Sequence, residues 1–183
     1  MTIAGLKLMV PTSVTATGVG SSASVSATGK VTFTTCATVT INGCFTSSYD
    51  NYLVVMRHSA ATNNETILAQ MSVGGTAATG SNYTYQYLDV GSTTVQGARG
   101  TSETSMRIGG SHSSAPNGDH VYFYGPYLAQ PTATRNINVR NISSAYITDY
   151  ACTHSLSTSY DGFKMSGILG NISGTLCVYG LAQ

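Results

Sequence analysis

Short runs of alternating side chains, separated by turn residues, are the feature of this chain that most constrains its fold. Residues Asn82 to Val90 (NYTYQYLDV) place Tyr83, Tyr85 and Tyr87 on one side of an extended chain, which is the two-residue period of a β-strand. Residues Lys30 to Ile41 (KVTFTTCATVTI) alternate in the same way. No amphipathic helix of useful length is found, because Gly or Thr interrupts every Ala-rich stretch. We therefore predict an all-β protein, an antiparallel, jelly-roll-like β-sandwich of roughly nine or ten strands.

Three segments refine this prediction. Asn42-Gly43 is the strongest turn signal in the chain. Tyr52 to His58 (YLVVMRH) is mostly apolar, so we expect a central strand that is buried on both faces. Gly109 to Asp119 (GGSHSSAPNGD) is rich in turn-forming residues, so we expect a loop.

The composition favours a packing role over several other classes of function. The chain has 183 residues, which suits one domain, and 49 of them are Ser or Thr. Only 8% are charged, against about 25% in ordinary globular domains. A surface of neutral hydroxyls and amides suits a protein that packs against copies of itself or a larger assembly. The sequence contains no basic run, so it gives no indication of nucleic-acid binding. No apolar run reaches the length of about 18 residues that spans a membrane.

The first 29 residues differ from the rest and are expected to form an extended N-terminal arm, residues 1–29, ahead of a sandwich domain, residues 30–183. Val14 to Gly29 is rich in Gly, Ser, Thr and Ala and is interpreted as a linker. The apolar residues before it form a candidate docking hook: Ile3, Leu6, Leu8, Met9 and Val10.

Chemical motifs are scarce. The four cysteines lack CxxC spacing and allow three disulfide pairings, although small buried side chains are the simpler expectation: Cys36, Cys44, Cys152 and Cys177. The seven carboxylates form no pair that the sequence places for acid–base work. The histidines show no metal-ligand spacing. We therefore expect no catalytic residues, no metal and no cofactor, and a protein that is not an enzyme.

The tyrosines of Asn82 to Val90 leave two interpretations open. Tyr83, Tyr85 and Tyr87 form either half-buried core or interface, or a flat platform for a sugar or a protein, since Tyr combines a rigid ring with a hydroxyl. His112, within the expected loop, is a further candidate for surface binding.

Two segments carry a resemblance to a known family. Phe45 to Val55 (FTSSYDNYLVV) and Gly174 to Gly180 (GTLCVYG) resemble small all-β structural proteins of tailed bacteriophages, over about Val31 to Gln183. The resemblance implies a compact sandwich, commonly a trimer, with a structural signature at four positions: Phe45, Tyr49, Asn51 and Tyr52. Tyr49 and Tyr52 are expected to fix the start of the strand by packing and hydroxyl hydrogen bonds.

The resemblance also implies a role. We expect a virion structural protein, made in the host bacterial cytoplasm and displayed on the particle surface as a tail-fibre or adhesin-like module. Its expected partners are copies of itself and other virion proteins, either a tail protein or the major capsid protein, and a host-surface glycan is a candidate ligand. The alternative is a capsid decoration (cement) protein, because only residues 1–29 stand where a fibre protein has its shaft. A cell-surface polysaccharide hydrolase is a remote alternative.

Overall fold

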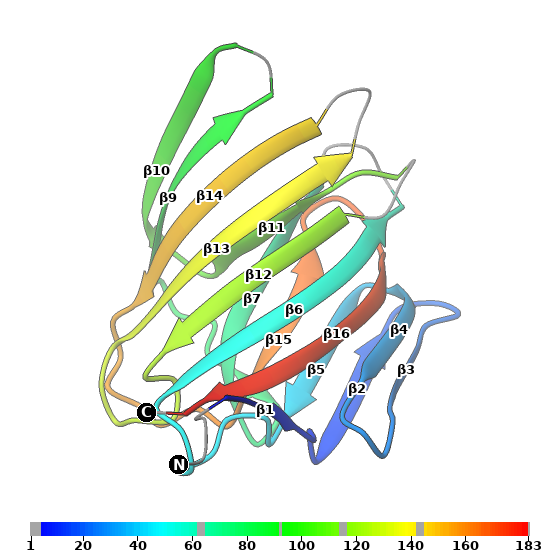
Figure 1. The fold of residues 1–183 in the computed structure, drawn as a ribbon, viewed down its shortest axis with the longest axis vertical. Coiled ribbons are helices and arrows are strands. Elements are labelled where there is room, and N and C mark those ends of the chain that lie inside the picture. Colours follow the sequence, from blue (N-terminus) through cyan, green and yellow to red (C-terminus); the bar gives the residue numbers. More distant parts are fainter. Residues whose placement is uncertain (1–4, 62–64, 92, 114–116, 142–144, 183) are drawn as a thin grey trace.

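The computed structural model describes residues 5–61, 65–91, 93–113, 117–141 and 145–182. All regular elements in these ranges are strands, sixteen in number, and they form two antiparallel sheets that pack against each other (Figure 1). The predicted all-β antiparallel sandwich is therefore confirmed, with more strands than expected. Successive strands β12, β13 and β14 lie side by side as a meander, and a jelly-roll order is not confirmed.

The larger sheet has ten strands. In spatial order they are β10 (Val95–Glu103), β9 (Tyr83–Val90), β14 (Ala145–His154), β13 (Thr132–Asn141), β12 (Asn117–Tyr124), β6 (Asn51–Ala60), β16 (Ile172–Leu181), β4 (Val31–Cys36) and β3 (Ser22–Val25), with β1 (Leu6–Met9) also paired to β16. The expected central strand is β6, although its Arg57 is exposed on the outer face.

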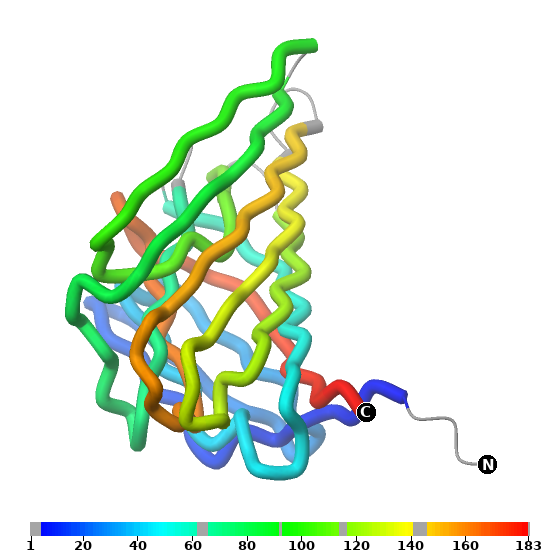
Figure 2. Tube along the Cα trace, turned by 90° about the vertical axis from the view of Figure 1, so that its left-hand side faces the viewer, coloured from blue at the N-terminus to red at the C-terminus, as the bar shows by residue number. Residues whose placement is uncertain are grey.

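The smaller sheet has six strands and lies behind the larger one (Figure 1). They are β11 (Met106–Ser111), β7 (Glu65–Val73), β15 (Gly162–Gly167), β5 (Thr38–Asn42) and β2 (Ser13–Thr17), with β8 (Thr76–Ala77) paired to β7. The hairpin of β9 and β10 extends beyond the end of this sheet (Figures 1 and 2). The two sheets therefore overlap only in part.

An aromatic cluster anchors the apolar part of the core. The ring centroid of Phe45 lies 4.8 Å from that of Tyr52, 5.3 Å from Phe123 and 5.7 Å from Phe163. The Tyr52 hydroxyl accepts a hydrogen bond from the Thr46 amide and donates one to the Thr46 carbonyl, both at 2.7 Å. Tyr52 thus fixes the turn before β6 to the strand itself, as expected from the sequence.

Tyr49 joins the two segments that carry the family resemblance. A Cβ atom at residue 180 would lie only 2.4 Å from Cδ2 of Tyr49, so the tyrosine ring lies directly on Gly180. The same ring meets Tyr52 edge to face, with centroids 6.2 Å apart. Gly180 pairs with Tyr52 across β16 and β6. The glycine is therefore needed for close approach between distant parts of the sequence.

The expected N-terminal arm needs correction within the described residues. β1 pairs with β16, β2 with β5 and β3 with β4, so this segment contributes to both sheets. Small alternating residues such as SVTAT suit edge strands, in which only one face receives partial cover. Of the docking hook, Leu6 and Val10 are exposed, while Leu8 and Met9 are half-buried; Ile3 lies outside the described residues. The division at residue 29 is not confirmed.

The four cysteines are free. Three are buried and Cys177 is half-buried, in line with the simpler of the two expectations. Burial raises the pKa of the Cys152 thiol to about 11, which keeps it protonated at neutral pH.

The contact between Tyr49 and Gly180 gives a first prediction. Gly180→Val should lower the free energy of unfolding by about 1–3 kcal/mol, because the added side chain must displace the Tyr49 ring. The measurement is urea unfolding at neutral pH. Gly118→Ala in the same sheet is the matched control, because a Cβ there meets no atom within 4 Å. Equal effects of the two substitutions would contradict the proposed contact.

Candidate functional site: a polar clamp behind an apolar outer face

Strand β13 has inverted polarity. Asn136 and Asn138 point between the two sheets and are 1% and 0% exposed. Ile137 and Val139, which alternate with them, point outward and are each 49% exposed. A sandwich strand usually turns its aliphatic side chains inward and its polar ones outward. Both departures therefore need a physical reason, one on each side of the sheet.

On the inner side, the asparagines cap the free edge of β11. This strand pairs with β7 on one side and ends the smaller sheet on the other. The Asn138 amide donates to the Gly110 carbonyl at 3.0 Å, and the Asn136 amide donates to the Ile108 carbonyl. The Cys152 thiol lies 3.2 Å from the Arg107 carbonyl oxygen. Side chains of the larger sheet thus take the place of a neighbouring strand for these buried carbonyls.

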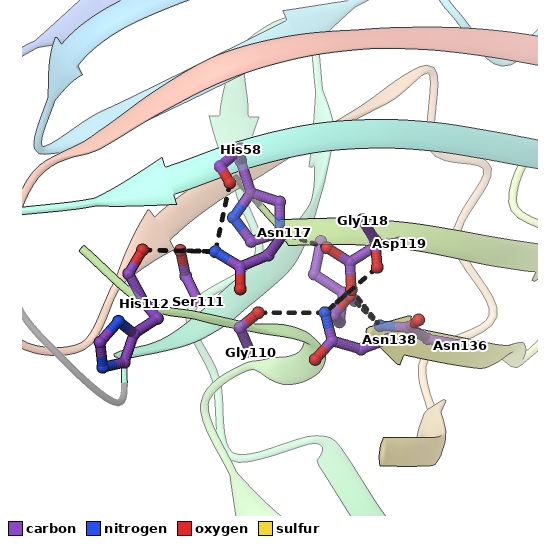
Figure 3. A network of polar contacts seen from close by, with 10 residues as sticks. His58, Gly110, Ser111, His112, Asn117, Gly118, Asp119, Asn136 and Asn138 are labelled. Carbon is purple, nitrogen blue, oxygen red and sulfur yellow. Dashed lines mark hydrogen bonds and ion pairs between the residues drawn. The ribbon is translucent and has the colours of Figure 1, made fainter. Parts of the chain in front are cut away.

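Asp119 on β12 orients both amides. Its Oδ1 accepts from Asn138 at 2.8 Å and from Asn136 at 3.3 Å, and its Oδ2 pairs with Nε2 of His58 on β6. Figure 3 shows these groups converging between the sheets. We call His58, Asp119, Asn136 and Asn138 the polar clamp. It connects three adjacent strands of the larger sheet to the edge of the smaller one.

Asn117 extends the polar clamp to the start of β12. Its amide group lies within 3.3 Å of the carbonyls of His58 and His112 and of the Ser111 hydroxyl (Figure 3). The expected loop from Gly109 to Asp119 is therefore shorter than predicted, because both of its ends belong to strands β11 and β12.

His112 is buried, which corrects its assignment as a surface-binding residue. Its backbone carbonyl takes part in the Asn117 contacts that close the end of the sandwich.

The polar clamp has the composition of a catalytic dyad but lacks access. The side chains of His58 and Asp119 are 1% and 0% exposed. Their bond partners are other members of the clamp. Within the described ranges, no group of three or more His, Cys, Asp or Glu residues could hold a metal ion. The arrangement is suited to fixing strand positions, because removing one partner of a buried network leaves the others unsatisfied.

The three tyrosines of β9, Tyr83, Tyr85 and Tyr87, differ in their burial. Tyr83 is fully buried, its hydroxyl donates to the Ala78 carbonyl at 2.8 Å, and its ring stacks on His154 at 4.1 Å. Burial raises the pKa of Tyr83 to about 12. Tyr83 is thus a core residue, the first of the two interpretations left open by the sequence, and it is not part of a surface platform. Tyr85 and Tyr87 are half-buried on the inner side of β9, with the Arg107 guanidinium 3.9 Å from the Tyr85 ring centroid.

On the outer side, aliphatic residues of several strands form one surface. Val139 pairs with Ile147, Ile147 with Val90, and Val90 with Val95 across successive strands. In the next row, Ile137 and Leu88 flank Asp149. We define the outer patch by its five most exposed aliphatic residues: Leu88, Val95, Ile137, Val139 and Ile147.

A groove borders the outer patch. It has a volume of about 440 Å³ and lies over Gly118, where the sheet has no side chain. Val55, Arg57 and His120 line it on one side, and Ile137 and Val139 on the other. A second hollow of about 280 Å³ lies on the same face, and its lining includes Leu88, Arg135 and Asp149.

The fold and site define an all-β antiparallel sandwich with a buried polar clamp and an exposed aliphatic face. Comparisons with models of protein families, with curated proteins and with solved structures found no match. Within the described part of the chain, no helix has the length and apolar character needed to cross a membrane.

Sequence reasoning did not identify the polar clamp as a set. Its signal is the alternation of Asn with aliphatic residues in RNINVR, Arg135 to Arg140. That pattern predicts a strand but fits either orientation of its faces.

The capping bonds of the clamp give a second prediction. Asn138→Ala should lower the free energy of unfolding by about 1–3 kcal/mol, because it leaves the buried Gly110 carbonyl without this donor. Gln86→Ala on the exposed face of β9 is the control and should change it by less than about 0.5 kcal/mol. Both are measured by urea unfolding. A loss for Asn138→Ala no larger than for the control would refute the capping role.

His154 gives a third prediction, on pH. Burial lowers the pKa of His154 below its usual 6.5, and its Nε2 lies 2.6 Å from the Tyr160 hydroxyl. The unfolded chain therefore binds the proton more readily, so this residue makes stability fall as pH drops below about 6.5. The loss of stability between pH 7 and 5 should be smaller in His154→Gln than in the wild type. An unchanged slope would show that His154 is not a source of the acid sensitivity.

Proposed function

We propose that this protein is a structural module that packs the outer face of its larger sheet against other protein surfaces in a virus particle. The inverted polarity of β13 is the observation that carries the proposal. It leaves Ile137 and Val139 about half exposed beside other aliphatic residues. Contiguous apolar surfaces of this kind on water-exposed domains mark interaction sites.

The polar clamp supports the same role from behind. Asn136 and Asn138 hold β13 against β11 by hydrogen bonds, so Ile137 and Val139, which alternate with them, are held on a fixed strand. A rigid element loses little conformational freedom on binding, which favours association through this face. The low charge of the chain, with net charge +1, removes one source of repulsion between packed protein surfaces.

The assignment to a virion rests on the resemblance of two segments to phage structural proteins. These segments meet in the fold where Tyr49 lies on Gly180. Within that assignment, a tail-fibre or adhesin-like module ranks first and a capsid decoration protein second. We assign the docking role to the outer patch instead of the N-terminal hook, because residues 6–9 form strand β1 and pair with β16. Tyr85 and Tyr87 remain candidate contacts for a host-surface glycan.

The fourth prediction concerns the particle. Antibody against this protein, carrying gold, should label intact particles of the phage that encodes it when viewed by electron microscopy. Label at the tail tip would indicate the fibre role, and label over the head the decoration role. Unlabelled particles in a lysate that contains the protein would contradict the virion assignment.

A pair of variants links this experiment to the outer patch. Val139→Lys, supplied to a phage that lacks the gene, should abolish the label, because a charge would be buried in the contact. Thr32 is an exposed residue of β4 in the same sheet, away from the patch. Particles that carry Thr32→Lys should be labelled normally. Normal labelling with Val139→Lys would exclude the outer patch as the packing surface.

A further inference from the structure

We propose that the outer patch is covered by a different protein, whose contacting surface is apolar in its centre and carries acidic side chains on two sides. This inference rests on the proposed function, because it takes the outer face of the larger sheet to be a packing surface. What it adds is the chemistry of the partner. It is drawn from the charged side chains of that face and from the hollows beside them.

The charges of the outer face are unbalanced. Three arginines and one aspartate point outward from the described strands of the larger sheet: Arg57, Arg99, Arg135 and Asp149. The Asp149 carboxylate is already neutralised within the chain, because its two oxygens accept hydrogen bonds from the Arg135 guanidinium at 3.2 and 2.7 Å. Arg57 and Arg99 are exposed and form no ion pair within the described residues. These strands therefore present unpaired positive charge on the outer face and no unpaired negative charge.

Other acidic groups of the chain are engaged elsewhere. Asp89 pairs with Arg140 on the inner side of the larger sheet, and Asp119 belongs to the polar clamp. The Asp161 carboxylate accepts from the Gly74 amide at the turn after β7. Two outer faces brought together would thus place four unpaired arginines in one contact, with no free carboxylate from these strands to face them. Like charges disfavour such a contact, so a partner with acidic side chains fits this face better than a second copy does.

Each unpaired arginine borders a hollow that is lined by neutral hydrogen-bonding side chains. The Arg57 hollow has a volume of about 280 Å³, and its lining includes five hydroxyl residues: Thr32, Thr34, Ser59, Ser173 and Thr175. The Arg99 hollow has a volume of about 390 Å³, and its lining includes Thr84, Gln86, Thr101 and Thr153. An Asp or Glu side chain that enters either hollow meets a guanidinium and several hydroxyl or amide donors. Hydrogen bonds from such groups to a carboxylate are stronger than those between neutral groups.

The outer patch lies between the two arginines. Arg99 is on β10 and Arg57 on β6, five positions apart in the sheet, which is roughly 24 Å at normal strand spacing. Strands β9, β14 and β13 between them carry four of the five aliphatic residues of the patch. A nucleic acid offers phosphates but no apolar surface for these residues, so the arrangement favours a protein. Carboxylates on two sides of an apolar contact also fix its register and exclude other partners.

The fifth prediction concerns charge reversal at the two arginines. Arg57→Glu and Arg99→Glu should each raise the dissociation constant for phage particles made without this protein by at least roughly tenfold, because attraction becomes repulsion. Lys164→Glu makes the same change of net charge on β15 of the smaller sheet and is the matched control, which should bind as the wild type does. Binding is measured as purified, labelled protein that sediments with the particles. Thermal unfolding followed by circular dichroism checks that each variant is folded.

Salt provides a second readout. The dissociation constant of the wild type should rise between about 50 and about 500 mM NaCl, because salt screens charges at the border of a contact. The rise should be smaller for Arg57→Gln and Arg99→Gln, which remove one charge each. A salt dependence that neither substitution changes would contradict a role for these arginines.

Three further results would overturn the inference. The first is equal dissociation constants for the wild type, Arg57→Glu and Arg99→Glu. The second is loss of binding after nuclease treatment of the particles, which would show that the acidic partner is nucleic acid. The third is self-association of the wild type at micromolar concentrations that Val139→Lys abolishes, which would show that a second copy covers the outer patch.

The two proposals can fail separately. A protein that binds particles through Val139 but is insensitive to both arginine reversals would overturn the acidic partner and leave the packing function intact. A folded wild type that does not bind particles at all would overturn both.

Discussion

The carboxylate of Asp119 is the group on which the rest of this structure depends. It accepts hydrogen bonds from Asn136 and Asn138 and pairs with His58, so one buried side chain sets the positions of two amides that cap the edge of the smaller sheet. Burial of such a group is unfavourable unless every lone pair finds a partner. The members of the network support one another, so the loss of one weakens the rest. Among the described residues, Oδ1 of Asn136, Oδ1 of Asn138 and Nδ1 of His58 nevertheless lack a hydrogen-bond partner. The polar clamp thus stabilises one end of the sandwich, and the aromatic cluster around Phe45 stabilises the other.

The same network explains why Ile137 and Val139 face outward. A strand alternates its faces, so a β13 that must turn Asn136 and Asn138 inward has to turn Ile137 and Val139 outward. Exposed aliphatic residues could be replaced by Ser or Thr, which the chain uses freely elsewhere. Their presence beside Ile147 and Leu88 leaves an exposed aliphatic surface, which is the basis of the proposed packing role. The inward hydrogen bonds of the asparagines and the outward exposure of Ile137 and Val139 are therefore two consequences of one alternating pattern in the sequence.

The sequence was sufficient to predict strands but insufficient to predict which side of β13 is buried. Alternation identifies the period, and a shift by one residue exchanges the two faces while keeping that period. RNINVR therefore gave no sign of the polar clamp. GGSHSSAPNGD predicts a loop because Gly, Ser and Asn favour turns, yet its ends form strands. There the Asn117 amide donates hydrogen bonds and the Ser111 hydroxyl and Gly110 carbonyl accept them. Tyr83 was ambiguous for a different reason. Its hydroxyl bonds with Met71 and Ala78 depend on how the two sheets pack, which a local sequence pattern does not specify.

Hydroxyl-radical footprinting of Ile137 and Val139 in dilute solution tests the central claim most directly. The account predicts fast modification of both residues, while core residues such as Val121 stay protected. Protection of Ile137 and Val139 in dilute solution would show that β13 turns them inward, and it would contradict the inverted polarity from which the clamp, the outer patch and the proposed function all follow.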